Sequence, residues 1–144
     1  MNVAEILSAK GSAVVTVRPE QTIEMVVHRL RMEKIGAVIV SSDGNSIDGI
    51  LSERDIAWGL TDHGAELMHK PVGELMTKSV ITCSPDDHVA QIARVMTQRR
   101  IRHLPVVEHG RLIGIVSVGD VVKHRLAELE LEANVLRDYA VSRR

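Results

Sequence analysis

The sequence predicts a mixed α/β protein built from two tandem β-α-β-β-α repeats and a C-terminal helix. The heptapeptide GILSERD at 49–55 has a near-copy, GIVSVGD, at 114–120. Sliding the chain by 66 residues also aligns identical residues: Thr16 with Thr82, Pro19 with Pro85, Ile35 with Ile101, Val40 with Val106 and Gly44 with Gly110. Each copy has the same order of apolar periodicities. Two copies of one folding unit explain all three observations.

Each unit begins with a short β-rich piece, VVTV at 14–17 or VITC at 80–83, which leads to a proline and an acidic turn. A helix follows, because apolar residues recur at i, i+3, i+4 and i+7. These residues are Ile23, Val26, Val27 and Leu30 in the first copy, and Val89, Ile92, Ala93 and Met96 in the second.

The remaining part of each unit reads as a hairpin and a second helix. IGAVIV at 35–40 and RHLPVV at 102–107 are predicted to be buried strands, each closed by a Gly-containing turn. The second arm is IDGILS or LIGIVS, and a helix starts after its Ser. We expect the first copy at 8–68, a joining segment at 69–75, the second copy at 76–132 and a helical tail at 122–144 that overlaps it.

Composition excludes several classes of protein. The 144 residues carry a formal net charge of −1 and almost no aromatics, with one Trp, one Tyr and no Phe. Single-stranded nucleic acid is usually gripped by aromatic stacking and a cationic groove, so a nucleic-acid role is disfavoured. The start lacks the apolar core of a signal peptide, and no apolar run could span a bilayer. With Cys83 as the only cysteine, a cytoplasmic protein is expected.

The repeated Ser and Asp lie where a strand ends and a helix begins. Free N–H groups and the helix dipole favour an anion such as phosphate there. A Ser hydroxyl can donate to a phosphate oxygen, and a carboxylate one turn later can accept from both hydroxyls of a ribose. Arg54, inside the first Ser-x-x-Asp, could add a charge-assisted contact, whereas Val118 and Gly119 in the second add no cation.

Ser-x-x-Asp before an apolar run is also a capping box, which requires no ligand. Both interpretations stay open at this point, because a Ser can cap the helix in the empty state and contact a ligand in the bound state.

This repeat resembles the CBS domain, over about residues 8 to 132. The most specific parts of the resemblance are HLPVV, the Gly-Ile-aliphatic-Ser strand ends and the Asp three residues after that Ser. Members of the family occur as tandem pairs whose sheets pack together and leave two clefts, and many of them bind adenosine-containing ligands. The resemblance therefore implies two clefts between the copies, each combining the Ser-x-x-Asp of one copy with strand residues of the other.

Carried over by position, the first cleft contains Ser52, Arg54, Asp55, Ile81, Thr82, Arg102, His103 and Leu104. The second contains Ser117, Gly119, Asp120, Val15, Thr16, Gly36, Ala37 and Val38. RRIRH at 99–103 puts cations beside the first cleft, which is therefore expected to prefer a phosphate-rich ligand. The second suits adenine or is empty. Arg99 and Arg100 also have a plain interpretation as cations at a helix C-terminus.

Other chemistry finds little support. The seven His residues follow no metal-binding spacing, and Cys83 sits in an apolar strand with no adjacent base, which indicates a structural thiol. No GxGxxG, Walker A or GxSxG motif is present, so neither an enzyme nor an obligatory cofactor or metal is expected.

The tail carries an apolar stripe with 4-3-4-3-4 spacing. Its members are Val122, Leu126, Leu129, Ala133, Leu136 and Ala140. The helix could fold onto its own module, but a stripe that runs past the repeat favours a second subunit or another protein.

The sequence thus predicts a regulatory module that binds AMP, ADP, ATP, NAD or S-adenosylmethionine between its repeats, forms a homodimer and signals to a protein partner. The alternatives are a ligand-free oligomerisation scaffold and a weak nucleic-acid-binding protein. Which adenosine ligand binds is not encoded in the motif, because all of these share the adenosine.

Overall fold

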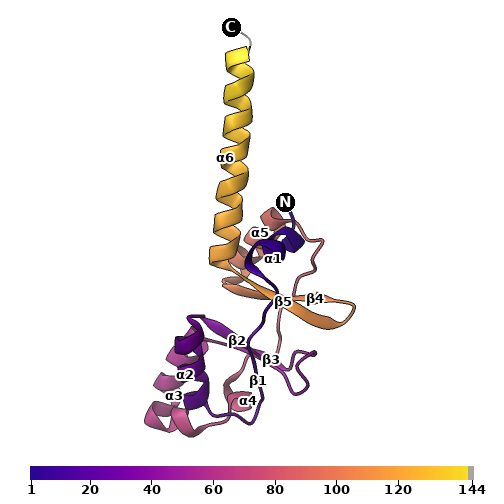
Figure 1. The fold of residues 1–144 in the computed structure, drawn as a ribbon. Coiled ribbons are helices and arrows are strands. Elements are labelled where there is room, and N and C mark those ends of the chain that lie inside the picture. Colours follow the sequence, from indigo (N-terminus) through magenta and orange to yellow (C-terminus); the bar gives the residue numbers. More distant parts are fainter. Residues whose placement is uncertain (143–144) are drawn as a thin grey trace.

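The computed structural model describes residues 1–142 as two lobes, with a long helix projecting from the second lobe (Figure 1). In chain order the helices and strands are α1 (Val3–Lys10), β1 (Thr16–Val17), α2 (Ile23–Glu33), β2 (Ala37–Val40), β3 (Gly49–Ser52), α3 (Glu53–His63), the 3-10 helix η1 (Gly64–His69), α4 (Val72–Leu75), α5 (Val89–Arg99), β4 (His103–Glu108), β5 (Arg111–Ser117) and α6 (Val118–Ser142). The predicted mixed α/β fold and the C-terminal helix are confirmed. The β-α-β-β-α order is complete in the first copy, whereas the second copy lacks the first strand within the described residues. Residues 143–144 of the predicted tail lie outside the described part.

Each copy has its own small sheet. In the first, β1 pairs parallel with β2 and β2 pairs antiparallel with β3, giving the order β1-β2-β3. In the second, β4 and β5 form an antiparallel pair. The VITC piece forms no strand there, and only Cys83 makes a parallel bridge, to Val106 of β4. Cys83 therefore occupies in the second copy the place that β1 holds in the first.

The first helices of the two copies are exchanged, which the sequence analysis did not predict. The short helix α1 precedes the first copy in the chain, yet Asn2 bridges to His88 and Val3 N donates to Asp87 O of the second copy. At the matching place, Pro71 at the start of α4 bridges to Thr22 of the first copy. Each lobe in Figure 1 thus contains a helix from the segment that leads into the other copy.

The exchange is fixed by apolar burial. Val3, Ile6 and Leu7 of α1 are buried in the core of the second copy, beside residues of α5, β4 and β5. Leu67 and Val72, from η1 and α4, are fully buried in the core of the first copy. Burying such side chains contributes about 1.5–3 kcal/mol each, so each core depends on the segment that leads into the other copy.

The repeated Gly of the Gly-Ile-aliphatic-Ser strands lies at a crossing, the point where the exchanged segment passes close to the strand. A side chain there would collide with that segment. A Cβ on Gly49 would lie 2.6 Å from Met76 Sδ and 2.9 Å from the Thr77 carbonyl oxygen. A Cβ on Gly114 would lie 2.7 Å from a methyl carbon of Leu7. In both copies, the bare backbone of the strand lets the exchanged segment pass.

The helix α6 begins in the second lobe and leaves it. Val121 is buried against that core, and Arg125 pairs with Glu128, whose other oxygen lies 3.9 Å from the N-terminal amine. From residue 129 to residue 142 every residue is exposed. In the part of the chain that the structure describes, no helix has the length and hydropathy that crossing a membrane requires.

Candidate functional site

Both Ser-x-x-Asp motifs form reciprocal caps. Ser52 Oγ accepts from Asp55 N at 3.3 Å, while Asp55 Oδ2 accepts from Ser52 N at 2.9 Å. Ser117 and Asp120 repeat this geometry at 3.2 and 2.9 Å. The capping interpretation is therefore confirmed in both copies. Each carboxylate keeps one oxygen, Oδ1, that is not used in the cap.

The two carboxylates differ in their next neighbours. Lys10 Nζ, from the exchanged helix α1, lies 2.7 Å from Asp120 Oδ2 and also donates to Ile115 O at 3.0 Å. Burial alone would raise the pKa of Asp120, but the hydrogen bonds from Lys10 and Ser117 lower it overall. Asp55 has instead a neutral neighbour, Thr77 Oγ1, which donates to Oδ1 at 3.4 Å. Among the described residues, a cation therefore neutralises the carboxylate of Asp120 but not that of Asp55.

The cation at the second motif was not predicted from the sequence, because Val118 and Gly119 carry no charge and Lys10 lies far away along the chain. The lysine ends an eight-residue helix, and its carboxylate partner lies 110 residues away. No local pattern relates the two. The signal that could have located it is the copied leading segment, VAEIL against VGELM, which aligns α1 with α4.

Arg54 reaches across to the other copy. Its Nη1 donates to Arg100 O at 2.8 Å, and its guanidinium lies 5.7 Å from the centre of the Trp58 ring. With Arg102 it lines a groove of about 420 Å³ between α5 and the start of α6. The other residues lining this groove are Ala93, Met96, Thr97, Arg100, Ile101, Val118, Val121 and Val122.

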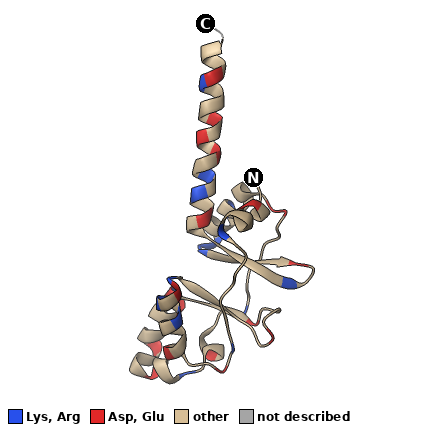
Figure 2. Cartoon of the chain, in the orientation of Figure 1, with Lys and Arg blue, Asp and Glu red and all other residues tan. Residues whose placement is uncertain are grey.

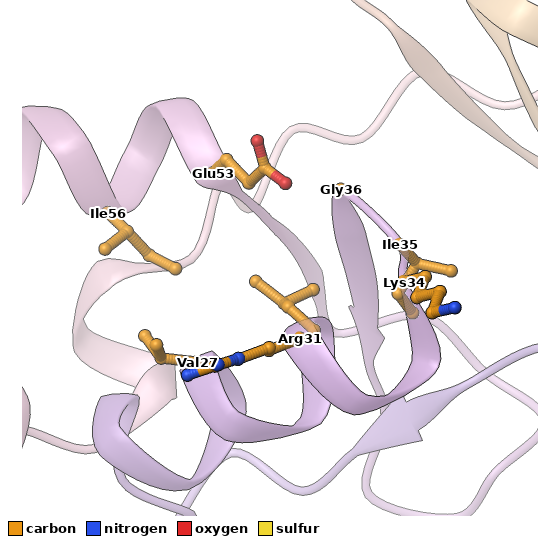
Figure 3. A pocket seen from close by; sticks show the side chains of 8 residues that line it. Val27, Arg31, Lys34, Ile35, Gly36, Glu53 and Ile56 are labelled. Atoms are coloured by element: carbon orange, nitrogen blue, oxygen red, sulfur yellow. The ribbon is translucent and has the colours of Figure 1, made fainter.

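A matching groove of about 480 Å³ lies between α2 and α3 of the first copy (Figure 3). Its lining residues are Val27, Leu30, Arg31, Lys34, Ile35, Gly36, Glu53 and Ile56. Each of these has its repeat counterpart in the α5–α6 groove, at an offset of 66 or 65 residues. The two grooves are therefore one feature of the unit, present twice. Their charges differ. Arg31, Gly36 and Glu53 of the first groove are replaced by Thr97, Arg102 and Val118 in the second, which Arg54 also lines.

Each predicted cleft combines the Ser-x-x-Asp motif of one copy with strand residues of the other copy. In the structure, these strand residues are direct neighbours of the Ser-x-x-Asp motif of their own copy. Ala37 is paired with Ser52 on β2 and β3, and His103 is paired with Ser117 on β4 and β5. Glu53 N donates to Gly36 O, as Val118 N donates to Arg102 O. The neighbours of a motif within its own copy were not predicted from the sequence.

His103 links the copies. A Cβ on Gly36 would lie 3.3 Å from His103 Cε1 and 3.6 Å from Glu53 Oε1, so the imidazole sits against the entry of β2. Burial lowers the pKa of His103, and the nearby charge of Arg102 lowers it further. The lowered pKa favours the neutral ring, which lies against a residue that the sequence analysis placed in the opposite cleft.

The other proposed residues have varied surroundings. Ile81 packs against the second core and Val15 against the first, while Thr82 is exposed. Thr16 lies half-buried on β1, and Gly119 is exposed in the first turn of α6. The side chains of Leu104, Val38 and Ala37 are buried at 0%, 0% and 4% exposure. These three support the strands from within the cores.

Residues 1–142 contain no group of three or more His, Cys, Asp and Glu side chains arranged to hold a metal ion. Cys83 is buried, and burial together with the charge of Asp87 raises the pKa of its thiol to about 12. Such a thiol is inert as a nucleophile at neutral pH.

Comparison with known proteins, by sequence and by structure, finds CBS-domain proteins in both cases. The sequence model of the CBS domain matches residues 3–61 and 72–127. A CBS domain-containing protein of Bacillus subtilis, YhcV, is 32% identical over 114 residues, which are 79% of this chain and 80% of that protein. A mitochondrial CBS domain-containing protein of Arabidopsis thaliana, CBSX3, is 29% identical over 95% of this chain and 70% of its own length.

Solved structures match the two-repeat architecture over most of the chain. The CBS-domain containing protein ATU1752 from Agrobacterium tumefaciens superposes with a TM-score of 0.84 at 42% identity, covering 87% of this chain and 99% of that one. The CBS domain pair of protein MJ0100, solved in complex with 5′-methylthioadenosine and S-adenosyl-L-methionine, superposes with a TM-score of 0.77 at 26% identity. That match covers 89% of this chain and 98% of the other.

Proposed function

The chain belongs to the CBS-domain family, and from this premise we propose that it is a regulatory module that binds an adenosine-containing ligand between its two repeats. It acts as a sensor rather than as an enzyme. Occupancy of the site changes the relative stability of alternative arrangements of the repeats, and a protein partner responds to the arrangement.

One observation carries the proposal. Two Ser-Asp pairs stand at equivalent helix N-termini, each with a carboxylate oxygen left outside the cap. The related domain pair of protein MJ0100 was solved with two adenosine derivatives. A ribose presents two adjacent hydroxyls, which suit a carboxylate, and a phosphate suits the N–H groups at a helix N-terminus.

We assign the ligand to the first cleft. Asp55 accepts from the ribose hydroxyls, while Arg54 and Arg102 supply positive charge for a phosphate. The residues Ser52, Ile81, Thr82, His103 and Leu104 complete the proposed site. The second cleft, with Ser117, Gly119 and Asp120, is the weaker candidate because Lys10 already neutralises the charge of its carboxylate.

The test is the stabilisation of ligand-free protein by candidate ligands, after denaturation and refolding to remove any bound molecule. AMP, ADP, ATP, NAD, S-adenosylmethionine and methylthioadenosine are each added, with GMP and GTP as controls. A ligand at a hundredfold excess over Kd stabilises the folded state by about 2.7 kcal/mol. If no adenosine compound shifts the melting temperature, the sensor proposal is wrong.

A matched pair of variants locates the site. Asp55→Asn and Asp120→Asn both keep an amide oxygen for the cap, but they lose the second carboxylate oxygen and the charge. The ligand-induced shift, measured for each variant against its own ligand-free state, is expected to disappear in Asp55→Asn and to persist in Asp120→Asn. The reverse result moves the ligand to the second cleft.

The second candidate function is a ligand-free scaffold, favoured by the completed caps at both motifs. It predicts that Asp55→Asn and Asp120→Asn differ from the wild type in stability alone. The proposed assembly is a homodimer under either function, and the exposed stripe of the tail supports it.

A further inference from the structure

The apolar stripe of α6 has no partner within the described chain. Leu129 and Leu136 are 50% and 69% exposed, and Ala133 and Ala140 are also exposed. The helix from residue 129 to residue 142 extends about 20 Å beyond the lobe (Figure 1). An isolated helix of this length is marginal in water, so packing is needed to hold it.

The stripe follows the a and d positions of a coiled coil. With Leu126 at position a, the a positions are Leu126, Ala133 and Ala140, and the d positions are Val122, Leu129 and Leu136. The remaining exposed aliphatic residues, among them Leu131 and Val135, lie outside this seam. Val122 also lines the α5–α6 groove, so the seam continues onto the second lobe.

Charged side chains flank the seam in an order that distinguishes the two possible directions. Position g holds Arg125 and Glu132, and position e holds Lys123, Glu130 and Arg137. Figure 2 shows basic residues near the base of the helix, acidic residues along its middle, and a basic residue beside an acidic one near its far end. In a parallel pair, each g residue faces the e residue five positions later on the other helix. Arg125 then faces Glu130, and Glu132 faces Arg137, twice each by symmetry.

An antiparallel pair that keeps the whole seam in contact brings like charges together. Its e positions place Glu130 opposite Glu130 and Lys123 opposite Arg137. Its g positions place Glu132 opposite Glu132. Like charges directly opposed are unfavourable, so the flanks select against this arrangement.

We propose that α6 pairs with α6 of a second copy as a parallel two-stranded coiled coil over residues 122–140, with both modules at the same end. This specifies the homodimer of the proposed function and does not depend on ligand binding. Arg125 exchanges its present partner Glu128, 2.7 Å away on the same helix, for Glu130 of the second copy.

Cysteine cross-linking of the full chain tests the direction. Ala140→Cys puts two thiols at one a layer of a parallel pair, so mild oxidation is expected to yield a disulfide-linked dimer. In the antiparallel pair with full seam contact, the introduced thiol at position 140 faces Val122 and no cross-link forms. Val135→Cys, exposed but outside the seam, is the control. Equal cross-linking of both variants, or none at Ala140→Cys, overturns the parallel seam.

A charge exchange provides an independent readout, the dimer Kd from sedimentation at low salt. Glu132→Arg places two cations together in the parallel pair, and the dimer Kd should rise about threefold to tenfold. Adding Arg137→Glu restores opposite charges and should return the Kd to the wild-type range. If Glu132→Arg has no effect, the parallel proposal fails, even if light scattering shows that the wild type is a dimer through another surface.

Discussion

The ammonium group of Lys10 lies 2.7 Å from Oδ2 of Asp120, a carboxylate 110 residues further along the chain. The pair joins the exchanged helix α1 to the start of α6 and distinguishes two repeats that otherwise carry the same motif. Its position makes the two Ser-x-x-Asp sites unequal.

Replacing Lys10 should make the sites more alike. In Lys10→Met the aliphatic stem remains, and the carboxylate of Asp120 loses its cation. If the first cleft alone binds the ligand in the wild type, calorimetry should give one site per chain. The variant should then show a second, weaker binding event. An unchanged stoichiometry would mean that Lys10 does not close the second cleft.

Lys10→Met should also change how stability depends on acid. The folded-state pKa of Asp120 is lowered, so its stabilising effect is present above the ordinary value of about 3.9 and is lost as the pH falls through the folded pKa. At pH 7 the free energy of unfolding of the variant should be about 1 kcal/mol lower than that of the wild type. The effect is small because both partners of the ion pair are partly exposed. This difference should shrink toward zero as the pH falls below about 4 and through the folded pKa. A difference that does not vary with pH would assign the loss to packing.

His103 predicts a second pH effect, closer to neutrality. Its folded-state pKa is lowered by burial, so the stability it gives is present above the unfolded value of about 6.5 and declines as the pH falls below that value. Denaturant unfolding at pH 7.5 and 5.5 should show this loss. His103→Gln, which stays neutral, should reduce the pH dependence. If the wild type and His103→Gln respond equally, His103 is not the group that titrates.

The two crossing glycines should tolerate a methyl group unequally. Gly49→Ala meets a backbone carbonyl oxygen as well as Met76, and it should destabilise the fold by about 1–3 kcal/mol. Gly114→Ala meets only the side chain of Leu7, which can move, and should cost less. Gly119→Ala is the control, because its nearest neighbour is Ser117 Oγ at 3.6 Å and Ala favours a helix. Equal losses for Gly49→Ala and Gly114→Ala would contradict the crossing geometry.

Cys83 should stay unreactive until the second lobe opens. Its buried thiol, with a pKa raised to about 12, should react with a thiol reagent at pH 7.5 far more slowly than the exposed thiol that Val135→Cys introduces outside the seam. Denaturant should bring the two rates together. Rapid labelling of native wild type would show that Cys83 is accessible.

The fold was predictable from the sequence where the signal is local or repeated. The helices α2 and α5 carry 3.6-residue periodicity, and the repeat located the strands around them. The exchange of α1 and α4 was not predictable from these patterns. Val3, Ile6 and Leu7 do show helical spacing, but a run of eight residues does not say which core it enters.

In the candidate site too, local contacts were predictable from the sequence and contacts between distant segments were not. Capping by Ser52 and Ser117 follows from the motif alone, because the bonds join residues three apart. The position of His103 beside Gly36 and the pair of Lys10 with Asp120 join distant segments, and only the tertiary structure brings them together. The composition of the two clefts stays a prediction.

The exchange of α1 and α4 has a consequence for a chain that holds a single repeat. Its leading helix would have no other copy to pack against, and its core would lack a covering helix unless the leading helix folded back onto its own sheet. Two such chains could complete each other by domain swapping, each lending its helix to its neighbour. The tandem protein is then a swapped dimer whose subunits are covalently joined. Joining freed the two copies to diverge, as the first site without a lysine and the lysine-filled second site have done.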